Sequence, residues 1–225
     1  MKSNLNPDEE LEKIIKNSDI GSVLKDYTET MIDKVIDNEF IKDIPLLSSI
    51  VASIKFGNSI NEHFFRKKIF NFLFELRVVP QERRKKIIDK LNTSSKYQNK
   101  VGETIIEIVD KIESEEKPNI LGKMFVAVLE EKINYLIFLK AAHILKSVFY
   151  YDLLDLKSNC KGEYIDNYSN DYLVIAGIIN VEYSSFVDVF ENNLNSNRDD
   201  YNLNNDSVKT KLTEVGKLII EIGMK

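Results

Sequence analysis

The sequence predicts a mainly α-helical protein, a multi-helix bundle followed by a small C-terminal α+β cap of winged-helix-like type. Glycine (8 residues) and proline (4 residues) are scarce in a chain of 225 residues, and few turn-forming residues indicate long elements. Apolar residues recur at intervals of three and four through most of the chain, which is the period of an amphipathic helix. After residue 156, short apolar segments alternate with polar loops. We therefore expect a bundle over residues 1–156 and a cap over residues 157–225.

The composition is that of an ordinary globular protein, with 43% hydrophobic and 30% charged residues. The one cysteine, Cys160, excludes an internal disulfide and fits a reducing compartment. The first residues contain no apolar core of a secretory signal. The longest uncharged run, residues 44–54, is much shorter than the roughly 20 residues of a membrane-spanning helix. We expect a cytoplasmic protein, whose contact with the inner face of a membrane would be peripheral.

The N-terminal third predicts helices separated by prolines. Pro7 opens "DEELEKIIKN" with acidic residues in the first turn, and an apolar stripe then runs from Ile20 to Val35. Residues 46–60 are apolar around most of a helix, and small residues recur there at every fourth position, namely Ser49, Ser53 and Gly57. Such a row lets another helix backbone approach closely. The sequence leaves open whether that second helix belongs to the same chain or to another copy.

Residues 62–78 predict a helix with two apolar faces. One is a core stripe of five side chains at helical spacing, namely Phe65, Ile69, Phe72, Leu73 and Leu76. Phe70 and Phe74 lie away from this stripe, and their angular neighbours are the cations Arg66, Lys67 and Arg77. This second face predicts a contact with a protein partner, another copy of the chain or an anionic membrane surface. The alternative is a second layer of core, with the cationic stems covering the rings.

The middle of the chain is basic. Residues 61–100 hold 11 Lys and Arg against 4 Asp and Glu, whereas residues 150–225 hold 7 against 13. The helix after Pro80 carries a run of cations, and the candidates for binding a nucleic-acid backbone are Arg83, Arg84, Lys86 and Lys90. The alternative is a solvated helix face. A winged-helix DNA reader would need a basic recognition element, but the candidate element after residue 165 holds acidic residues and no cation.

Further helices are expected over residues 101–112 and after Pro118, each with an apolar stripe. Asn134 is the expected N-cap of a long helix that reaches Leu156 and buries Phe149. In the cap, "SSFVDVF" alternates like a strand, and "SVKTKL" predicts a strand that leads into a terminal helix capped by Thr213.

The residues of an active site are not apparent in the sequence. The two histidines are His63, near a helix start, and His143, which we expect to be partly buried. The chain has neither a His/Cys cluster with zinc spacing nor a glycine-rich phosphate loop. We therefore predict no catalytic residue, no metal and no cofactor, and a protein that is not an enzyme.

Three segments of the C-terminal half carry a family resemblance: "EEKPNILGKMFVAVLEE", "YLVIAGIINVEY" and "KLTEVGKLIIEIG". In this order, over roughly residues 115–223, they resemble the abortive-infection alpha group of small proteins from bacteria and mobile elements. The resemblance implies a role in phage defence or its regulation and brings no catalytic residues. The resulting hypothesis is a non-enzymatic interaction protein, acting as an oligomer or with a partner through residues 64–77. The alternative is a nucleic-acid-binding regulator that uses the basic middle helices.

Overall fold

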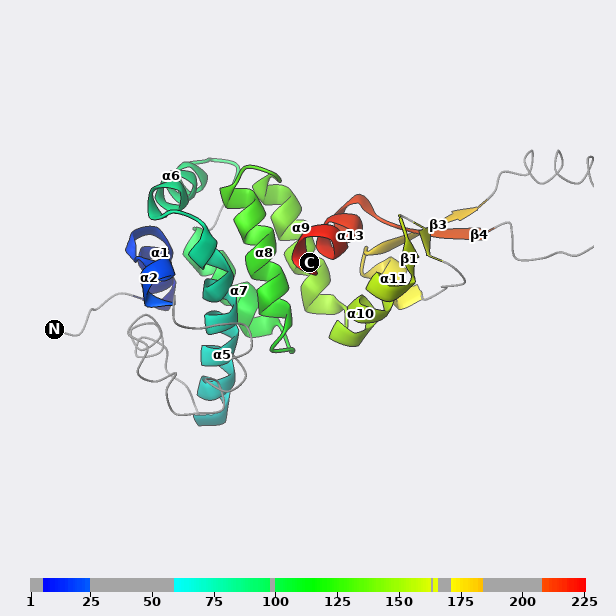
Figure 1. Ribbon diagram of the computed structural model, residues 1–225, viewed down its shortest axis with the longest axis horizontal. Coiled ribbons are helices and arrows are strands. Elements are labelled where there is room, and N and C mark those ends of the chain that lie inside the picture. Colours follow the sequence, from blue (N-terminus) through cyan, green and yellow to red (C-terminus); the bar gives the residue numbers. More distant parts are fainter. Residues whose placement is uncertain (1–5, 25–58, 98–99, 163, 166–170, 184–207) are drawn as a thin grey trace, which may run out of the picture.

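The computed structural model describes residues 6–24, 59–97, 100–162, 164–165, 171–183 and 208–225. In chain order the helical elements of the first part are α1 (Pro7–Asn17), α2 (Ile20–Val23), α5 (Ser59–Glu75), η2 (Leu76–Val78), α6 (Gln81–Asn92), α7 (Val101–Lys111), α8 (Lys117–Leu129) and α9 (Tyr135–Ser147). The second part contains α10 (Tyr150–Asn159), β1 (Cys160–Lys161), β2 (Tyr164–Ile165), α11 (Asp171–Ile175), β3 (Ile179–Tyr183), β4 (Val208–Leu212), α13 (Glu214–Leu218) and η4 (Ile219–Gly223). The predicted helical bundle with a small antiparallel cap is confirmed (Figure 1).

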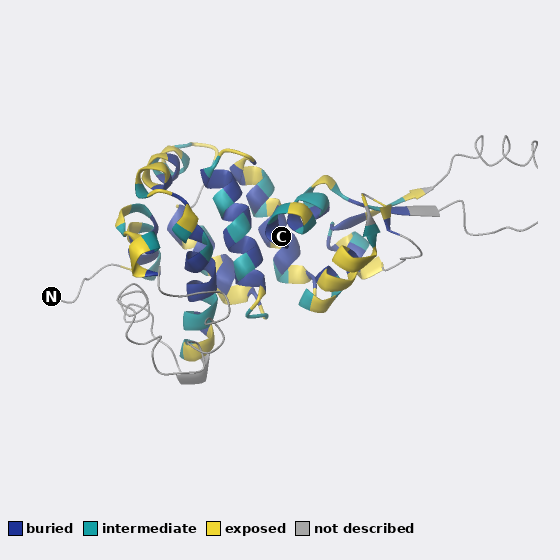
Figure 2. Ribbon diagram, in the orientation of Figure 1, coloured by how far each residue is buried: buried dark blue, intermediate teal, exposed yellow. Residues whose placement is uncertain are grey.

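Helix α8 lies at the centre of the bundle. It packs against α5, α6, α9 and η4, and most of its residues are buried (Figure 2). Its predicted apolar stripe is confirmed, since each member is buried: Ile120, Leu121, Met124, Phe125, Val128 and Leu129. A helix that is apolar on most sides is stable only when neighbours cover it from most sides. The sequence of α8 therefore dictates its central place.

The crossing of α5 and α8 depends on a glycine. A Cβ atom on Gly122 would lie 2.8 Å from Cβ of Glu75 and 2.9 Å from the carbonyl oxygen of Phe72. The two backbones approach so closely because Gly122 has no side chain. The row predicted for close packing, Ser49, Ser53 and Gly57, lies outside the described residues.

The long helix predicted from Asn134 to Leu156 is wrong, because the chain forms two helices there. Asn134 caps α9 as expected, with Oδ1 accepting a hydrogen bond from the Ile137 N–H at 3.0 Å. However, α9 ends at Ser147, and Val148 is extended. The ammonium of the buried Lys117 accounts for the break: it donates to the carbonyl oxygens of Leu145 (2.8 Å) and Val148 (2.7 Å). These carbonyls at the helix end are thereby satisfied without a further turn.

The cap is built on a four-stranded antiparallel sheet in the order β1-β2-β4-β3. Strands β3 and β4 pair from Ile179↔Leu212 to Tyr183↔Val208. Helix α10 precedes the sheet, and α11 lies between β2 and β3 in the chain. Strand β4 inserts between β2 and β3, which is the strand order of a winged-helix sheet. The predicted strand "SSFVDVF" lies outside the described residues.

The terminal helical segment joins the cap to the bundle. Thr213 caps α13 as expected, with Oγ1 accepting from the Gly216 N–H at 3.0 Å. The following η4 packs against α8, so the C-terminus lies between the bundle and the cap (Figure 1). One connected apolar core runs from Leu11 to Met224. The division predicted after residue 156 falls inside α10.

None of the helices in the described ranges has both the length and the apolar character needed to cross a membrane.

Candidate functional site

The aromatic and basic face predicted on α5 is not an exposed surface. Phe70 is 1% exposed and Phe74 is 0% exposed, and their rings stack with centroids 6.0 Å apart. The expectation that these two rings project from the core is therefore wrong. The other interpretation of the sequence, a second layer of core, describes them correctly. The helical projection of α5 identified one core stripe, which would need one neighbouring helix. In the structure α5 packs against both α7 and α8, so more than one of its faces is buried.

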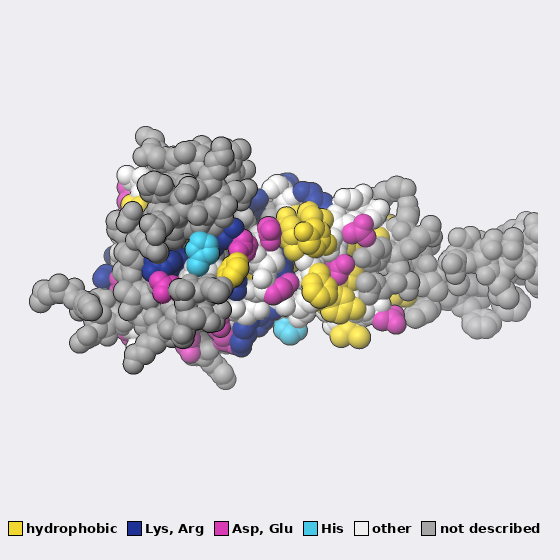
Figure 3. All heavy atoms as spheres, turned by 90° about the horizontal axis from the view of Figure 1, so that it is seen from below, with side chains coloured by type: hydrophobic (Ala, Val, Ile, Leu, Met, Phe, Trp, Pro, Cys, Tyr) yellow, Lys and Arg dark blue, Asp and Glu magenta, His cyan; other side chains and the backbone are white. Residues whose placement is uncertain are grey.

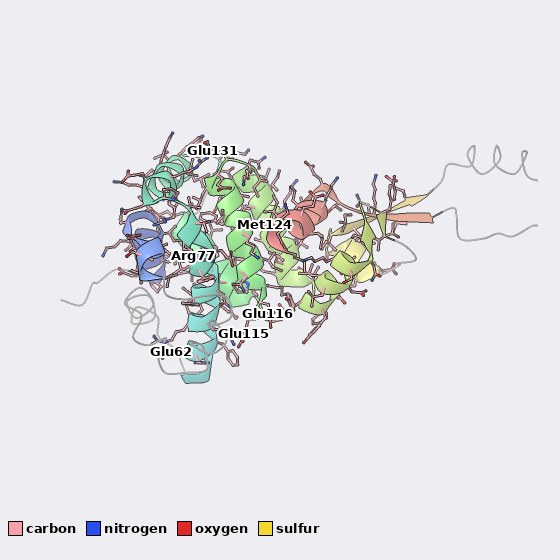
Figure 4. The ribbon with its side chains drawn as sticks, viewed as in Figure 1. Glu62, Arg77, Glu115, Glu116, Met124 and Glu131 are labelled. Carbon is pink, nitrogen blue, oxygen red and sulfur yellow. The ribbon has the colours of Figure 1, made fainter. Side chains whose placement is uncertain are left out.

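The cations beside these rings bind groups of the same chain. Arg66 pairs with Glu62 and Lys67 pairs with Glu115, near the end of α5 marked by those two glutamates in Figure 4. The Arg77 guanidinium lies 3.5 Å from the centroid of the Phe74 ring, a cation–π contact. It also donates to the Phe74 carbonyl oxygen at 2.6 Å. The five predicted residues thus form an internal cluster that stabilises α5.

Two residues of the candidate nucleic-acid patch, Arg83 and Arg84, make hydrogen bonds within the chain. Arg84 is 2% exposed, and its guanidinium donates to the carbonyl oxygens of Ile15 (2.7 Å), Ser18 and Val79. Arg83 donates to the carbonyl oxygens of Leu129 (2.8 Å) and Glu130 (2.9 Å). Apart from the Val79 carbonyl, which follows η2, these carbonyls lie at the C-terminal ends of α1 and α8, where the helix dipole is negative. Two of the four cations therefore cap helices.

Arg83 is exposed despite these hydrogen bonds, and the other two cations of the set, Lys86 and Lys90, are exposed as well. Lys90 lies 3.4 Å from Oε1 of Glu131, which is labelled at the upper end of α8 in Figure 4. Lys86 is exposed and makes no hydrogen bond or ion pair with a residue in the described ranges. The structure does not bring the four cations together on one exposed surface.

A groove lies between α9 and the cap. Its volume is about 550 Å³, within the range of roughly 300–1,000 Å³ typical of ligand pockets. The lining residues come from three segments, namely Leu139, Lys140, His143 and Ile144; Ala176 and Gly177; and Thr213, Glu214 and Val215. His143 is exposed at this groove, so the expectation that it is partly buried is wrong. We call this feature the α9 groove.

Local backbone chemistry fixes the cap side of the α9 groove. Gly177 has φ of 80°, a left-handed conformation that lets the chain turn from α11 into β3. The Thr213 hydroxyl donates to the Gly177 carbonyl oxygen at 2.8 Å while it caps α13. The start of α13 is thereby held against the turn, and the two segments form one wall.

An exposed apolar surface lies beside the groove. Ten large hydrophobic side chains are exposed among the described residues, and six of them lie between residues 149 and 175. We call five of these, on or next to α10 and α11, the aromatic face: Phe149, Tyr151, Leu154, Tyr172 and Ile175. Figure 3 shows hydrophobic side chains gathered in this part of the molecule, with acidic side chains among them.

Two contacts hold the aromatic face in place. The ring centroids of Phe149 and Tyr172 are 6.1 Å apart. The Tyr172 hydroxyl donates to the carbonyl oxygen of Ser147 at the end of α9. Phe149 is nevertheless 63% exposed and Ile175 is 85% exposed. Single exposed hydrophobic residues are ordinary, but several that gather in one region of the surface, as in Figure 3, are typical of a binding surface.

The α9 groove adjoins the aromatic face at the end of α9 and at the end of α11. Ile175 of the aromatic face directly precedes Ala176 of the groove. On α9, Ile144 of the groove is one turn before Ser147, which binds Tyr172. We call the groove and the face together the docking seam.

The aromatic end of the docking seam is acidic. Burial raises the pKa of Tyr172, and the negative charges of Asp152 and Glu113 raise it further. Neither Asp152 nor Asp171 has a hydrogen bond or ion pair to its side chain in the part of the chain that the structure describes. The cation on α10, Lys157, instead donates to the Met224 carbonyl oxygen. At the groove end, Lys140 and Glu214 offset each other in charge.

The reactive side chains of the described residues bear on two kinds of site, a metal site and a nucleophilic thiol. Within the described ranges, no three His, Cys, Asp or Glu side chains gather as metal ligands. Burial raises the pKa of the Cys160 thiol, which disfavours the nucleophilic thiolate. The docking seam presents exposed apolar side chains and a groove, with acidic side chains beside them.

Comparison with known proteins gives no match: no family model matches the chain, and neither a curated protein nor a solved structure shows significant similarity to it.

The sequence interpretation missed the docking seam because it assigned Phe149 to the core stripe of a helix that ends earlier. One signal was present. "FYYDLLDL" begins with three consecutive aromatic residues, Phe149, Tyr150 and Tyr151. Successive residues point 100° apart on a helix, so one stripe cannot bury all three. The groove itself is formed by segments distant in sequence, and no local pattern encodes it.

Proposed function

We propose that this chain is a non-enzymatic interaction protein that binds a segment of a protein partner along the docking seam. The observation that carries the proposal is the group of exposed apolar side chains on α10 and α11, held by the Phe149–Tyr172 contact. Aromatic residues are enriched at the energetic centres of protein interfaces. The adjoining groove offers a concave site for an apolar anchor, as in grooves that receive an amphipathic helix.

A partner of a different sequence is favoured over a second copy of the chain. In a symmetric dimer through the aromatic face, Asp152 and Asp171 of each copy would lie in the same interface. Carboxylates brought together without cations repel each other, and removing them from water costs further free energy. Anionic lipid would meet the same repulsion.

The biological setting that we propose is phage defence or its regulation, in a bacterium or a mobile element. It is supported by the resemblance of three C-terminal segments to the abortive-infection alpha group. The docking seam lies within the part of the chain that carries this resemblance. The basic middle helices supply little support for a nucleic-acid-binding regulator, because Arg83 and Arg84 bind backbone carbonyls.

The proposal is tested by selecting ligands from a displayed library of random peptides of about twelve residues, with the full chain as bait. Selected peptides are then measured against a double variant, Phe149→Ser with Ile175→Asp. We expect binding to fall at least about tenfold, since the contact area and an apolar anchor are lost. The matched control is Val78→Ser, which changes a side chain 63% exposed, as Phe149 is, but located on η2.

Two results would overturn the proposal. One is a set of selected peptides that bind the double variant and the control equally well. The other is recruitment to vesicles of phosphatidylserine that requires Phe149 and Ile175, since this would make the same side chains a membrane surface.

A further inference from the structure

Resting on the proposed function, we infer that the partner segment is basic. An Arg or Lys side chain would lie over the Phe149–Tyr172 pair beside Asp152, next to an apolar residue that enters the α9 groove.

The aromatic pair provides a surface suited to a cation. Phe149 and Tyr172 meet at an interplanar angle of 39° with centroids 6.1 Å apart, and Phe149 leaves most of its area exposed. A cation within about 6 Å of an aromatic centroid is attracted by the negative face of the ring, and a guanidinium also stacks on it. The chain itself uses this contact elsewhere, between Arg77 and the buried Phe74.

An acidic side chain that pairs with no cation of the described residues lies beside the aromatic pair and favours a cation over other polar groups. Asp152 is half-buried on the first turn of α10, and Asp171 is exposed next to Tyr172. No cation of the described residues pairs with either of them. A carboxylate whose charge no cation of the described residues offsets attracts a cation that arrives with a ligand, and the two can form a charge-assisted hydrogen bond. The raised pKa of Tyr172 is consistent with this negative potential.

The position of the cation within the segment follows from the other charges of the docking seam. Glu113 forms an ion pair with Lys117, which offsets part of its charge, and the groove walls carry both Lys140 and Glu214. The uncompensated negative charge is therefore at the aromatic end. An acidic or phosphorylated segment would meet Asp152 and Asp171 as like charges, which disfavours it.

The test uses the peptides selected on the full chain, each synthesised in three forms: with its basic residue, with glutamine there and with glutamate there. We expect the basic form to bind at least about tenfold more tightly than the glutamate form, with an affinity that falls as salt rises. Asp152→Asn should weaken the basic form severalfold and leave the glutamine form unchanged. The control Glu82→Gln changes an exposed carboxylate on α6, in another part of the molecule, and should have no effect.

Failure of this inference is distinguishable from failure of the proposed function. Peptides that require Phe149 and Ile175 but show no excess of Arg and Lys over the library would overturn the inference and leave the docking seam intact. The same holds if Asp152→Asn weakens the basic and glutamine forms equally, since Asp152 would then act through the fold. Peptides that bind without Phe149 and Ile175 would overturn both.

Discussion

The ring centroids of Phe149 and Tyr172 lie 6.1 Å apart, although Phe149 directly precedes α10 and Tyr172 belongs to α11 in the cap. The contact is made where Lys117 stops α9 and the chain turns into α10. The same buried lysine that divides the predicted long helix thereby leaves Phe149 at the surface. The docking seam is thus a consequence of how the helix ends are capped.

Aromatic residues on α5 and on the aromatic face should differ in their effect on stability. Phe74→Ala should lower the free energy of unfolding by about 3–5 kcal/mol, because it leaves a cavity in the core. Phe149→Ala should change it by less than about 1 kcal/mol, because most of this ring is already in water. Urea denaturation followed by circular dichroism measures both values. Similar losses in the two variants would contradict the assignment of Phe149 to the surface.

The basic residues of α6 should likewise separate into two groups. Arg84→Met should cost about 2–4 kcal/mol, because three backbone carbonyls lose a charged donor inside the fold. Lys86→Met, two residues away and exposed, should stay within about 0.5 kcal/mol. Thermal unfolding of both variants beside the wild type gives the comparison. An Arg84 variant as stable as the Lys86 variant would show that Arg84 does not hold α1 to α6.

We predict that the folded protein loses stability at alkaline pH because Tyr135 is buried. Burial raises the pKa of its phenol from 10.0 to about 12. Between these values the unfolded chain releases the proton and the folded chain keeps it, so the free energy of unfolding falls as pH rises. The loss amounts to about 2–3 kcal/mol once pH passes the folded pKa. Tyr135→Phe should have a shallower slope than the wild type above about pH 10 in urea denaturation. Parallel slopes would mean that Tyr135 titrates normally.

Thr213 should stabilise the wall of the α9 groove through its hydroxyl. Thr213→Ala removes both the cap of α13 and the hydrogen bond to Gly177, and we expect a loss of about 1–2 kcal/mol. Thr213→Ser keeps the hydroxyl and should recover most of this stability. Amide hydrogen exchange should show faster exchange at Gly216 in the alanine variant alone. Equal exchange in both variants would show that the hydroxyl does not hold this wall.

The sequence was sufficient for the helices that are buried on regular stripes. The apolar positions of α7 and α8, the N-cap at Asn134 and the N-cap at Thr213 follow from local patterns, and the structure confirms them. Such features are set by residues three or four positions apart, which one chain segment contains in full.

Features that depend on distant partners were not predictable in the same way. The burial of Phe70 and Phe74 requires neighbours beyond α5, and the residue pattern of α5 does not identify these neighbours. The sequence around Arg84 is that of an exposed cationic helix face, and only the folded chain brings the carbonyls of Ile15 and Ser18 to its guanidinium. The α9 groove is formed by three segments that meet only in the folded chain. Local patterns therefore gave the elements, whereas the binding surface arises from their assembly.

The most direct test of the docking seam uses the two histidines of the chain as reporters in an NMR titration. His143 lines the α9 groove, whereas His63 is exposed on α5 and serves as the internal control. When a selected basic peptide is added to the full chain, we predict that the imidazole signals of His143 shift and those of His63 do not. Shifts at His63 alone, or saturable binding that moves neither histidine, would contradict a binding site at the docking seam.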